Sequence, residues 1–350
     1  MSRRQHSNVG PWRIDDSAVY ERKSRDKQLS LLLRFAILEP SRQNTQPWTF
    51  SITNDGVDVY ADYSRRLPVV DPVDGELLMS VGAAIMNFRV AAARFGFDVS
   101  VSYTPGREGR VPVAHISVCQ TYAPDEELIA LFPAILRQHT NRGWTWLRQR
   151  SPSAALEDEP IDPTALSTVC DVLDRFPETL RLVSPHQKRR AAPLIDFASR
   201  SQRSRPMSSE ELPAWIRPGG NDGPSEEGGR PASLITGPWP LPLFGAGAVP
   251  APLARQGIES EPALIVVTSE DDRGSLIQAG EVLERLLLVI TAARLQYSFF
   301  NHPIELEDLR DRVPMLAAYP LQPQVLLRVS GARASAPLTR RRRLEDVGTR

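Results

Sequence analysis

The amino-acid sequence predicts an α+β fold, with antiparallel-type sheets flanked by helices and two related halves in one chain. Segments with the 3.6-residue apolar period of helices alternate with short segments that have the pattern of strands. Glycine and apolar positions of the first half also recur in the second half. The chain has 350 residues, 41% of them hydrophobic and 24% charged, so it is long enough to bury the cores of about two domains.

The first half begins with a helix and a hairpin. Apolar residues at helical spacing over residues 29 to 38 predict a helix, which Pro40 ends. The sequence Asn-Asp-Gly at residues 54 to 56 favours positive φ, which is typical of a tight turn between two strands. We therefore expect strands over residues 48 to 53 and 57 to 61.

A long helix and two more strands complete the first half. The pattern predicts a helix over residues 75 to 95, with Gly96 in the left-handed position that ends many helices. Residues 99 to 103 and 114 to 118 alternate between polar and apolar side chains, as half-buried strands do.

The second half contains a similar set of elements and an insertion. We expect helices over residues 125 to 139, 163 to 176, 186 to 200, 209 to 216 and 275 to 295, and strands over residues 180 to 183, 263 to 268 and 324 to 329. Residues 218 to 256 are dense in Gly and Pro and predict a long, lid-like loop, with a disordered insert as the alternative.

Matching positions suggest that the two halves are duplicates. Gly82, Ile85, Phe88 and Phe97 fall opposite Gly280, Leu283, Leu286 and Leu295, at a constant offset of 198 residues. Such a repeat indicates a fused homodimer, a pseudo-two-fold pair within one chain. We divide the chain into a polar leader (residues 1 to 27), a first half (28 to 124) and a second half (125 to 350) that carries the insertion.

Composition and missing motifs narrow the function. Lys and Arg number 42, as do Asp and Glu, so no overall field favours nucleic acid. We find neither an apolar leader nor a membrane-spanning run, and we expect a cytoplasmic protein with Cys119 and Cys170 as core thiols. The five histidines have no metal-ligand spacing, and dinucleotide, phosphate-loop and hydrolase motifs are missing. We therefore predict no metal site and expect a bound cofactor to supply the chemistry.

The most specific segment spans residues 39 to 50. Its residues Pro40, Ser41, Asn44, Gln46, Pro47 and Trp48 match the pattern Pro-Ser-x-x-Asn-x-Gln-Pro-Trp. This pattern resembles the hallmark of the nitroreductase superfamily, with Glu39 at the position of the usual alanine. Pro40 ends the preceding helix and leaves Ser41, Arg42 and Asn44 on a short polar loop, the kind of loop that can meet the edge of a flavin ring.

Three further stretches resemble one branch of that superfamily, typified by the mycobacterial Acg proteins. They are the Asp-Tyr-Ser-Arg-Arg-Leu sequence at residues 62 to 67, the His-Thr-Asn-Arg sequence at 139 to 142, and the closing strand and Arg-rich tail at 323 to 347. Gln138 stands where the branch has the leading arginine of Arg-x-Thr-Asn-Arg. The resemblance covers about residues 28 to 348.

The resemblance implies a nitroreductase-like fold that holds FMN between its halves. The implied cofactor-binding residues are Pro40, Ser41, Arg42, Asn44, Thr140, Arg142, Glu305, Arg341 and Arg342. Of these, Ser41 and Asn44 fall on ring-contacting positions, and Glu305 lies in a loop that approaches the flavin N5 and O4 edge. Leu306 replaces a usual glycine in that loop. Arg341 and Arg342 fall on the phosphate-binding tail, with a solvated basic tail as the alternative.

The implied function is that of an FMN-dependent oxidoreductase. It would take a hydride from NAD(P)H onto flavin N5 and pass electrons to a small conjugated acceptor, and no catalytic side chain is assigned. Two alternatives stay open: a protein that binds or sequesters FMN with little turnover, and a tailoring reductase or dehydrogenase of a biosynthetic pathway. We expect a small-molecule substrate, no nucleic-acid or membrane partner, and a monomer with an internal pseudo-dimer or a homodimer.

Overall fold

The computed structural model describes most of both halves. It covers residues 10–14, 24–104, 111–121, 123, 125–138, 161–204, 211, 214–215, 220–223, 263–305, 309, 312–313, 316, 321–331 and 339–348. Thr140, Arg142 and Leu306 lie outside the described residues, as do most of the predicted helix at 209 to 216 and all but residues 220–223 of the predicted insertion.

The first half folds as one sheet with helices packed on it. Its strands are β1 (Trp48–Ile52), β2 (Gly56–Ala61), β3 (Phe97–Tyr103) and β4 (Ala114–Gln120), and its helices are α1 (Arg25–Ala36) and α2 (Gly75–Arg94). Helix α3 (Glu126–Ile135), the first helix of the second half, packs against α2. All neighbouring strands are antiparallel, in the order β1-β2-β4-β3. The predicted hairpin is confirmed, with Trp48 opposite Ala61 and Ile52 opposite Val57.

The second half contains a sheet of the same size and strand order. Its strands are β5 (Leu180–Leu182), β6 (Ala263–Ser269), β7 (Leu295–Phe299) and β8 (Gln322–Gly331), and its helices are α5 (Pro163–Arg175), α6 (Pro185–Ser204), α9 (Arg273–Ala292), α10 (His302–Glu305) and, at the C-terminus, α12 (Leu344–Val347). This antiparallel sheet has the order β5-β6-β8-β7, which repeats that of the first sheet strand for strand. The predicted α+β class is confirmed.

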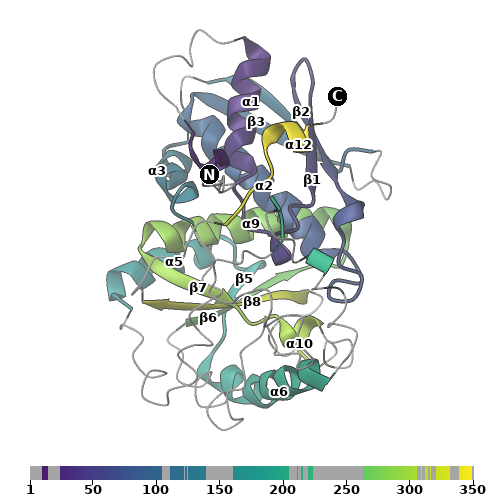
Figure 1. Ribbon diagram of the computed structural model, residues 1–350. Coiled ribbons are helices and arrows are strands. Elements are labelled where there is room, and N and C mark those ends of the chain that lie inside the picture. The colour runs from purple at the N-terminus through teal and green to yellow at the C-terminus, as the bar shows by residue number, and fades with distance from the viewer. Residues whose placement is uncertain are drawn as a thin grey trace, which may run out of the picture.

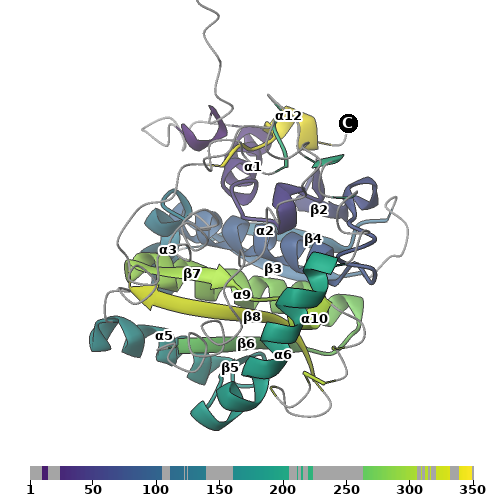
Figure 2. The ribbon, with the colours of Figure 1, turned by 60° about the horizontal axis from the view of Figure 1, so that its bottom comes forward.

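Helices α2 and α9 form the centre of the molecule, between the two sheets (Figure 1; Figure 2 shows the same layers after rotation). They approach most closely at Gly82 and Gly280. A Cβ atom on Gly82 would lie 1.8 Å from the carbonyl oxygen of Ile277, and one on Gly280 would lie 2.0 Å from that of Met79. Each glycine therefore lets the backbone of one helix touch the backbone of the other.

The same packing explains why α2 is so apolar. By length and hydropathy α2 passes the test for a membrane-crossing helix, but 89% of its most apolar window is buried inside the protein. Its apolar side chains pack against α9, α1, α3 and sheet residues. We therefore assign α2 as a core helix.

One predicted boundary is wrong and instructive. The sequence predicts a helix up to residue 295, whereas α9 ends at Ala292 and Leu295 begins strand β7. The turn between them is made by Arg294, which has a left-handed φ of 58°. In the first half the predicted Gly96 makes the same turn, with a φ of 77°. An arginine does not signal a left-handed turn as glycine does, so the end of α9 was missed.

The prediction that both cysteines are core thiols is also wrong. Cys119 is exposed, near the end of β4, and Cys170 is only partly buried, on α5; both are free thiols. Cys119 and the neighbouring Gln120 lie where β4 runs beyond the core, so hydrophobic character alone does not place this thiol inside.

We expect Gly82→Ala and Gly280→Ala to destabilise the protein by at least about 2 kcal/mol each, because overpacked contacts against backbone cannot relax by rotamer changes. Gly274→Ala is the matched control, since its added methyl would meet only the Asp272 side chain, at 3.3 Å. Urea unfolding measures all three variants. Equal stability of the Gly82 variant and the Gly274 variant would show that the helices are not in backbone contact.

Candidate functional site

The loop that follows α1 is held in an unusual backbone conformation. Gln43, Asn44 and Gln46 all have left-handed φ angles, of 49°, 54° and 51°, and each such non-glycine residue costs about 1 to 3 kcal/mol. The three-residue helix η3 (Arg42–Asn44) lies within this loop. The hallmark loop, residues 39 to 48, is nonetheless largely buried. Strain of this kind persists only where surrounding contacts fix it.

Gln46 supplies several of those contacts, and its side chain is fully buried. Its backbone N–H donates to Ser41 Oγ at 2.9 Å. Its side-chain nitrogen donates to the carbonyl of Asn221 at 2.9 Å, and its side-chain oxygen accepts from the backbone N–H of Arg342 at 2.7 Å. Gln46 therefore joins three segments that are far apart in the sequence.

Asn44 acts in the same way beside it. Its side-chain nitrogen donates to the carbonyls of Gly223 and Arg340, both at 3.0 Å, and its side-chain oxygen accepts from Arg341 Nη1 at 3.1 Å. The Asn44 carbonyl also accepts from the backbone N–H of Gly223 at 3.0 Å. The chain's own groups therefore use both the donor and the acceptor ends of this carboxamide.

The C-terminal tail, residues 339 to 348, returns from the second half to lie against this loop. Helix α12 packs on α1 and β1, and Gly348 forms a parallel bridge with Phe50 (Figure 1). Arg341 donates to the Leu38 carbonyl at 2.9 Å and lies over the Trp12 ring. The tail arginines and the hallmark loop, predicted to share one site, are thus brought together.

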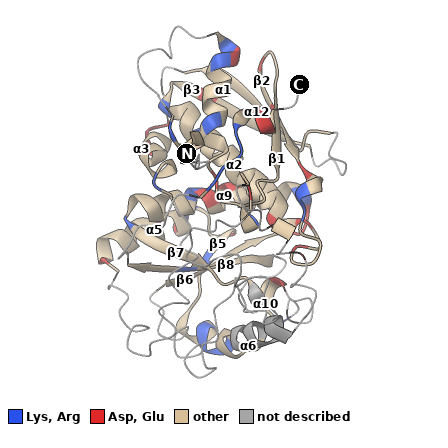
Figure 3. Cartoon of the chain, viewed as in Figure 1, with Lys and Arg blue, Asp and Glu red and all other residues tan. Residues whose placement is uncertain are grey.

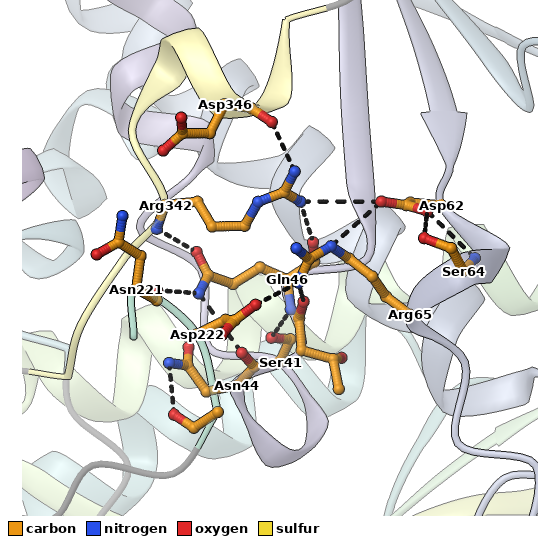
Figure 4. Close-up of polar contacts among 12 residues, drawn as sticks. Ser41, Asn44, Gln46, Asp62, Ser64, Arg65, Asn221, Asp222, Arg342 and Asp346 are labelled. Atoms are coloured by element: carbon orange, nitrogen blue, oxygen red, sulfur yellow. Dashed lines mark hydrogen bonds and ion pairs between the residues drawn. The ribbon is translucent and has the colours of Figure 1, made fainter. Parts of the chain in front are cut away.

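Arg342 is a buried cation that forms no ion pair shorter than 4.0 Å among the described residues (Figure 4). Its guanidinium donates to the carbonyls of Gln46 at 3.1 Å and Asp346 at 2.6 Å. Among the described residues, only the carboxylate of Asp62 lies within ion-pair distance, at 4.0 Å. Burial and the nearby Arg65 lower the pKa of Arg342 below its ordinary value, because they outweigh the opposing carboxylates of Asp62, Asp222 and Asp346. A buried cation without a close counter-charge is costly, so this position favours an anionic group.

The solvated-tail alternative is therefore wrong for two of the tail arginines. Arg341 and Arg342 are 2% and 8% exposed, whereas the Arg343 side chain is 62% exposed and pairs with Glu345 at 3.1 Å. Arg340 is partly buried and donates to the carbonyl of Gly220 at 3.2 Å.

Residues 220–223 complete this part of the site. Asp222 is buried and forms an ion pair with Arg65 at 2.8 Å, and Arg65 also pairs with Asp62 at 3.2 Å. Figure 4 shows Asn221 and Asp222 directly beside Asn44 and Gln46. A short stretch of the predicted insertion thus packs on the hallmark loop of the other half.

A second cluster of charges surrounds Arg42. Its guanidinium pairs with Glu305 of α10 at 2.5 Å and with Glu76 of α2 at 3.3 Å, and Asn301 donates to Glu76 at 2.7 Å. Burial alone would lower the pKa of Arg42, but the carboxylates of Glu305 and Glu76 outweigh it and raise that pKa. Burial, together with the charge of Glu76, raises the pKa of Asp71 to about 7. Arg42 therefore ties the hallmark loop to Glu305 of the second half, which the sequence predicts in a loop but which forms the last residue of helix α10.

The structure thus brings together most of the predicted site residues. Pro40, Ser41, Arg42, Asn44, Glu305, Arg341 and Arg342 all lie in or against the hallmark loop. The sequence analysis missed Gln46, Glu76, Asn221, Asp222 and Asn301 as site residues. Only Gln46 carried a signal, its place in the hallmark. In the described part of the chain no group of three or more His, Cys, Asp or Glu is arranged to hold a metal ion.

The amino-acid sequence is similar to those of several known proteins. No family model matches the chain. A Mycobacterium tuberculosis (strain H37Rv) protein provisionally named an NAD(P)H nitroreductase is 28% identical over 327 residues, which is 90% of this chain and 89% of the relative. The protein named Acg from the same strain, provisionally an NAD(P)H nitroreductase, is 25% identical over 328 residues, 90% of this chain and 93% of the relative.

A third relative from that strain, an uncharacterised protein, is 25% identical over 320 residues, covering 88% of this chain and 89% of the relative. The similarity to all three is spread over nearly the whole length. The predicted resemblance is confirmed: the chain is related to the nitroreductases and, within them, to the Acg branch.

We expect Gln46→Leu to destabilise the protein by about 2 to 4 kcal/mol, because it leaves the buried Arg342 N–H and the partly buried Asn221 carbonyl without partners. Gln43→Leu is the matched control: Gln43 lies in the same buried loop, but its side-chain oxygen has no hydrogen-bond partner. Thermal unfolding of both variants tests this. Loss of stability in the Gln43 variant but not in the Gln46 variant would contradict the role given to Gln46.

Proposed function

We propose that this chain is an FMN-dependent NAD(P)H oxidoreductase of the nitroreductase type. The names of its relatives support an oxidoreductase, and FMN is our assignment. The observation that carries it is the buried Arg342, set beside Arg341 against the hallmark loop with only Asp62 at 4.0 Å among the described carboxylates. The dianionic FMN phosphate fits this donor set, because guanidinium groups bind phosphate oxygens through paired hydrogen bonds.

The hallmark loop and helix α10, joined by the ion pair between Arg42 and Glu305, would flank the flavin ring. Pro40 and Ser41 lie at the start of that loop, and Glu305 is the last residue of α10. The carboxamide of Asn44 is already occupied by chain partners, so we assign Asn44 to holding Arg341 and the tail in place. Thr140 and Arg142 complete the proposed contacts, to the ribityl chain and phosphate.

We propose further that the two halves are a fused pseudo-dimer with one flavin per chain. The identical strand orders of the two sheets and the central pair α2 and α9 support the duplication. Only the first half carries the hallmark, since the matching position before β5 reads Arg-Phe-Pro-Glu-Thr at residues 175 to 179. One phosphate site and one hallmark loop therefore imply one FMN.

Bound FMN would accept a hydride from NAD(P)H and pass electrons to a small conjugated acceptor. The residues of this chain would bind, orient and shield it: Arg342, with Arg341 beside it, would hold the phosphate, and the hallmark loop would position the ring. We place the protein in the cytoplasm, where the reduced nicotinamide is available, and expect neither nucleic-acid nor membrane partners.

The absorption spectrum of the purified protein, saturated with FMN and then treated anaerobically with NADPH and with NADH, tests this function. We expect one bound FMN per chain and bleaching of the flavin band by a reduced nicotinamide. Failure to bind FMN would contradict the cofactor assignment. A bound flavin that neither nucleotide reduces would contradict the enzyme and support a protein that sequesters FMN.

Arg342→Ala should weaken FMN binding by about ten- to a hundredfold, the loss of one charge-assisted hydrogen bond of about 1.5 to 3 kcal/mol. Riboflavin lacks the phosphate, so its affinity should change little, which also shows that the site has stayed folded. Arg343→Ala is the control, because this neighbouring arginine is exposed. Equal losses for FMN and riboflavin, or no loss for either, would contradict the phosphate contact; both affinities are measured by flavin fluorescence quenching.

A further inference from the structure

A second group of buried polar side chains lies in the middle of the molecule, where α2, α3 and α9 meet. Glu284 of α9 and Asn87 of α2 are both 0% exposed, and Gln138, which follows α3, is 2% exposed. Figure 3 shows acidic positions along α9, in the middle of the molecule. None of these three residues was assigned a role above.

The carboxyl of Glu284 and the carboxamide of Gln138 each have one oxygen atom without a hydrogen-bond donor among the described residues. The Gln138 side-chain nitrogen donates to Glu284 Oε2 at 3.0 Å. The two remaining oxygens, Glu284 Oε1 and Gln138 Oε1, are buried and have no hydrogen-bond partner among the described residues. A carboxylate oxygen and an amide oxygen are both acceptors, so they cannot bond to each other unless one of them carries a proton.

The nearby cations are engaged elsewhere. Arg89 of α2 pairs with Glu281, one turn before Glu284 on α9, at 2.6 Å, and Glu281 also accepts a hydrogen bond from Tyr103. Arg285 of α9 pairs with Glu127 of α3 at 2.8 Å.

The tail contributes Arg341, which exerts some electrostatic attraction on Glu284. Its guanidinium nevertheless donates to Leu38, Asn44, Thr339 and Arg340. Asn87, the neighbour on α2, is uncharged; it approaches Glu284 and lowers the pKa of that carboxyl, but neither polar atom of its side chain forms a hydrogen bond of good geometry. No cation among the described residues lies within ion-pair distance of Glu284, and an unpaired ionised carboxylate in such a place is strongly unfavourable.

We propose that Glu284 is a protonated carboxylic acid at neutral pH and that it pairs with the Gln138 carboxamide through two hydrogen bonds. In this pair the amide N–H donates to Glu284 Oε2, and the hydroxyl on Oε1 donates to Gln138 Oε1. The proton thereby supplies a partner for both of the unpartnered oxygens at once. Burial raises the pKa of Glu284 to about 8, in the same direction, although Gln138, Arg341 and Asn87 oppose that increase.

The pair gives Gln138 and Glu284 a positioning role, an inference that rests on the proposed function. Gln138 is the last described residue before the segment, residues 139 to 142, that resembles a flavin-binding motif. Where the branch carries an arginine at this position, this chain carries a neutral amide bound to a neutral acid. The acid–amide pair would fix the position of Gln138, and raising the pH would break the pair.

The sign of the pH effect follows from the raised pKa. A carboxyl that keeps its proton longer when folded stabilises the protein fully below its unfolded pKa, and this stabilisation is lost as the pH rises through the folded value. The unfolding equilibrium constant of the wild type, relative to that of Glu284→Gln, should rise by up to about tenfold per pH unit between roughly pH 5 and pH 8, then level off.

Urea unfolding of the full chain between pH 5 and pH 9.5 measures this ratio. Glu284→Gln keeps the planar shape of the carboxylic acid and a hydrogen-bond donor in place of its hydroxyl, but it cannot ionise. Glu281→Gln is the matched control on the same helix; it leaves Arg89 without its carboxylate and should destabilise the protein at neutral pH. Gln138→Arg is the second variant, because its cation should ionise Glu284 and remove the pH slope without removing the glutamate.

The infrared spectrum at pH 7 provides an independent measurement. We expect the carbonyl band of a protonated carboxylic acid in the wild type, and its loss from both Glu284→Gln and Gln138→Arg. A pH-independent stability ratio, or no change in this band, would overturn the proposal. The FMN affinity of the wild type shows whether a negative result concerns only this proposal. If FMN binds as expected but Glu284 does not titrate, the acid–amide pair is contradicted and the proposed function is not.

Discussion

The backbone contact between α2 and α9 at Gly82 and Gly280 is the constraint on which the rest of the structure depends. It brings the two helices close enough to serve as one shared core, with a four-stranded sheet on either side. The same two helices also carry charged residues of both polar clusters. The first turn of α2 carries Glu76, which pairs with Arg42, and the middle of α9 carries Glu281 and Glu284.

A second constraint is the strained backbone of the hallmark loop, where the C-terminal tail and residues 220–223 pack on the first half. The hallmark loop is strained at Gln43, Asn44 and Gln46, and its hydrogen bonds are completed by residues from the C-terminal tail and from positions 220–223. The C-terminal tail and a stretch of the predicted insertion must therefore reach the first half before this loop is fully formed. The same contacts bury Arg342, whose ion pair with Asp62 is 4.0 Å long. The residues that connect the two halves therefore also form the proposed phosphate site.

Sequence patterns predicted the positions of helices and strands well, but they did not predict which residues contact each other in the folded chain. Helical periodicity, the Asp-Gly turn and Gly96 placed most of the first half correctly, because each is a local signal. Strand β7 was missed because Arg294 makes a turn that glycine usually makes. The hallmark and tail arginines were found through their resemblance to a family. Glu76, Asn301 and Asp222 were not, since only the folded chain brings them to Arg42 and Arg65.

The central claim is that the hallmark loop and the tail arginines form one FMN site between the halves. A crystal structure of the FMN-saturated protein tests it most directly. The account predicts one FMN per chain, its phosphate bonded to Arg342 and its ring between the Ser41 loop and the turn at Glu305. A phosphate bound away from Arg341 and Arg342, or an equivalent second flavin beside β5, would contradict it.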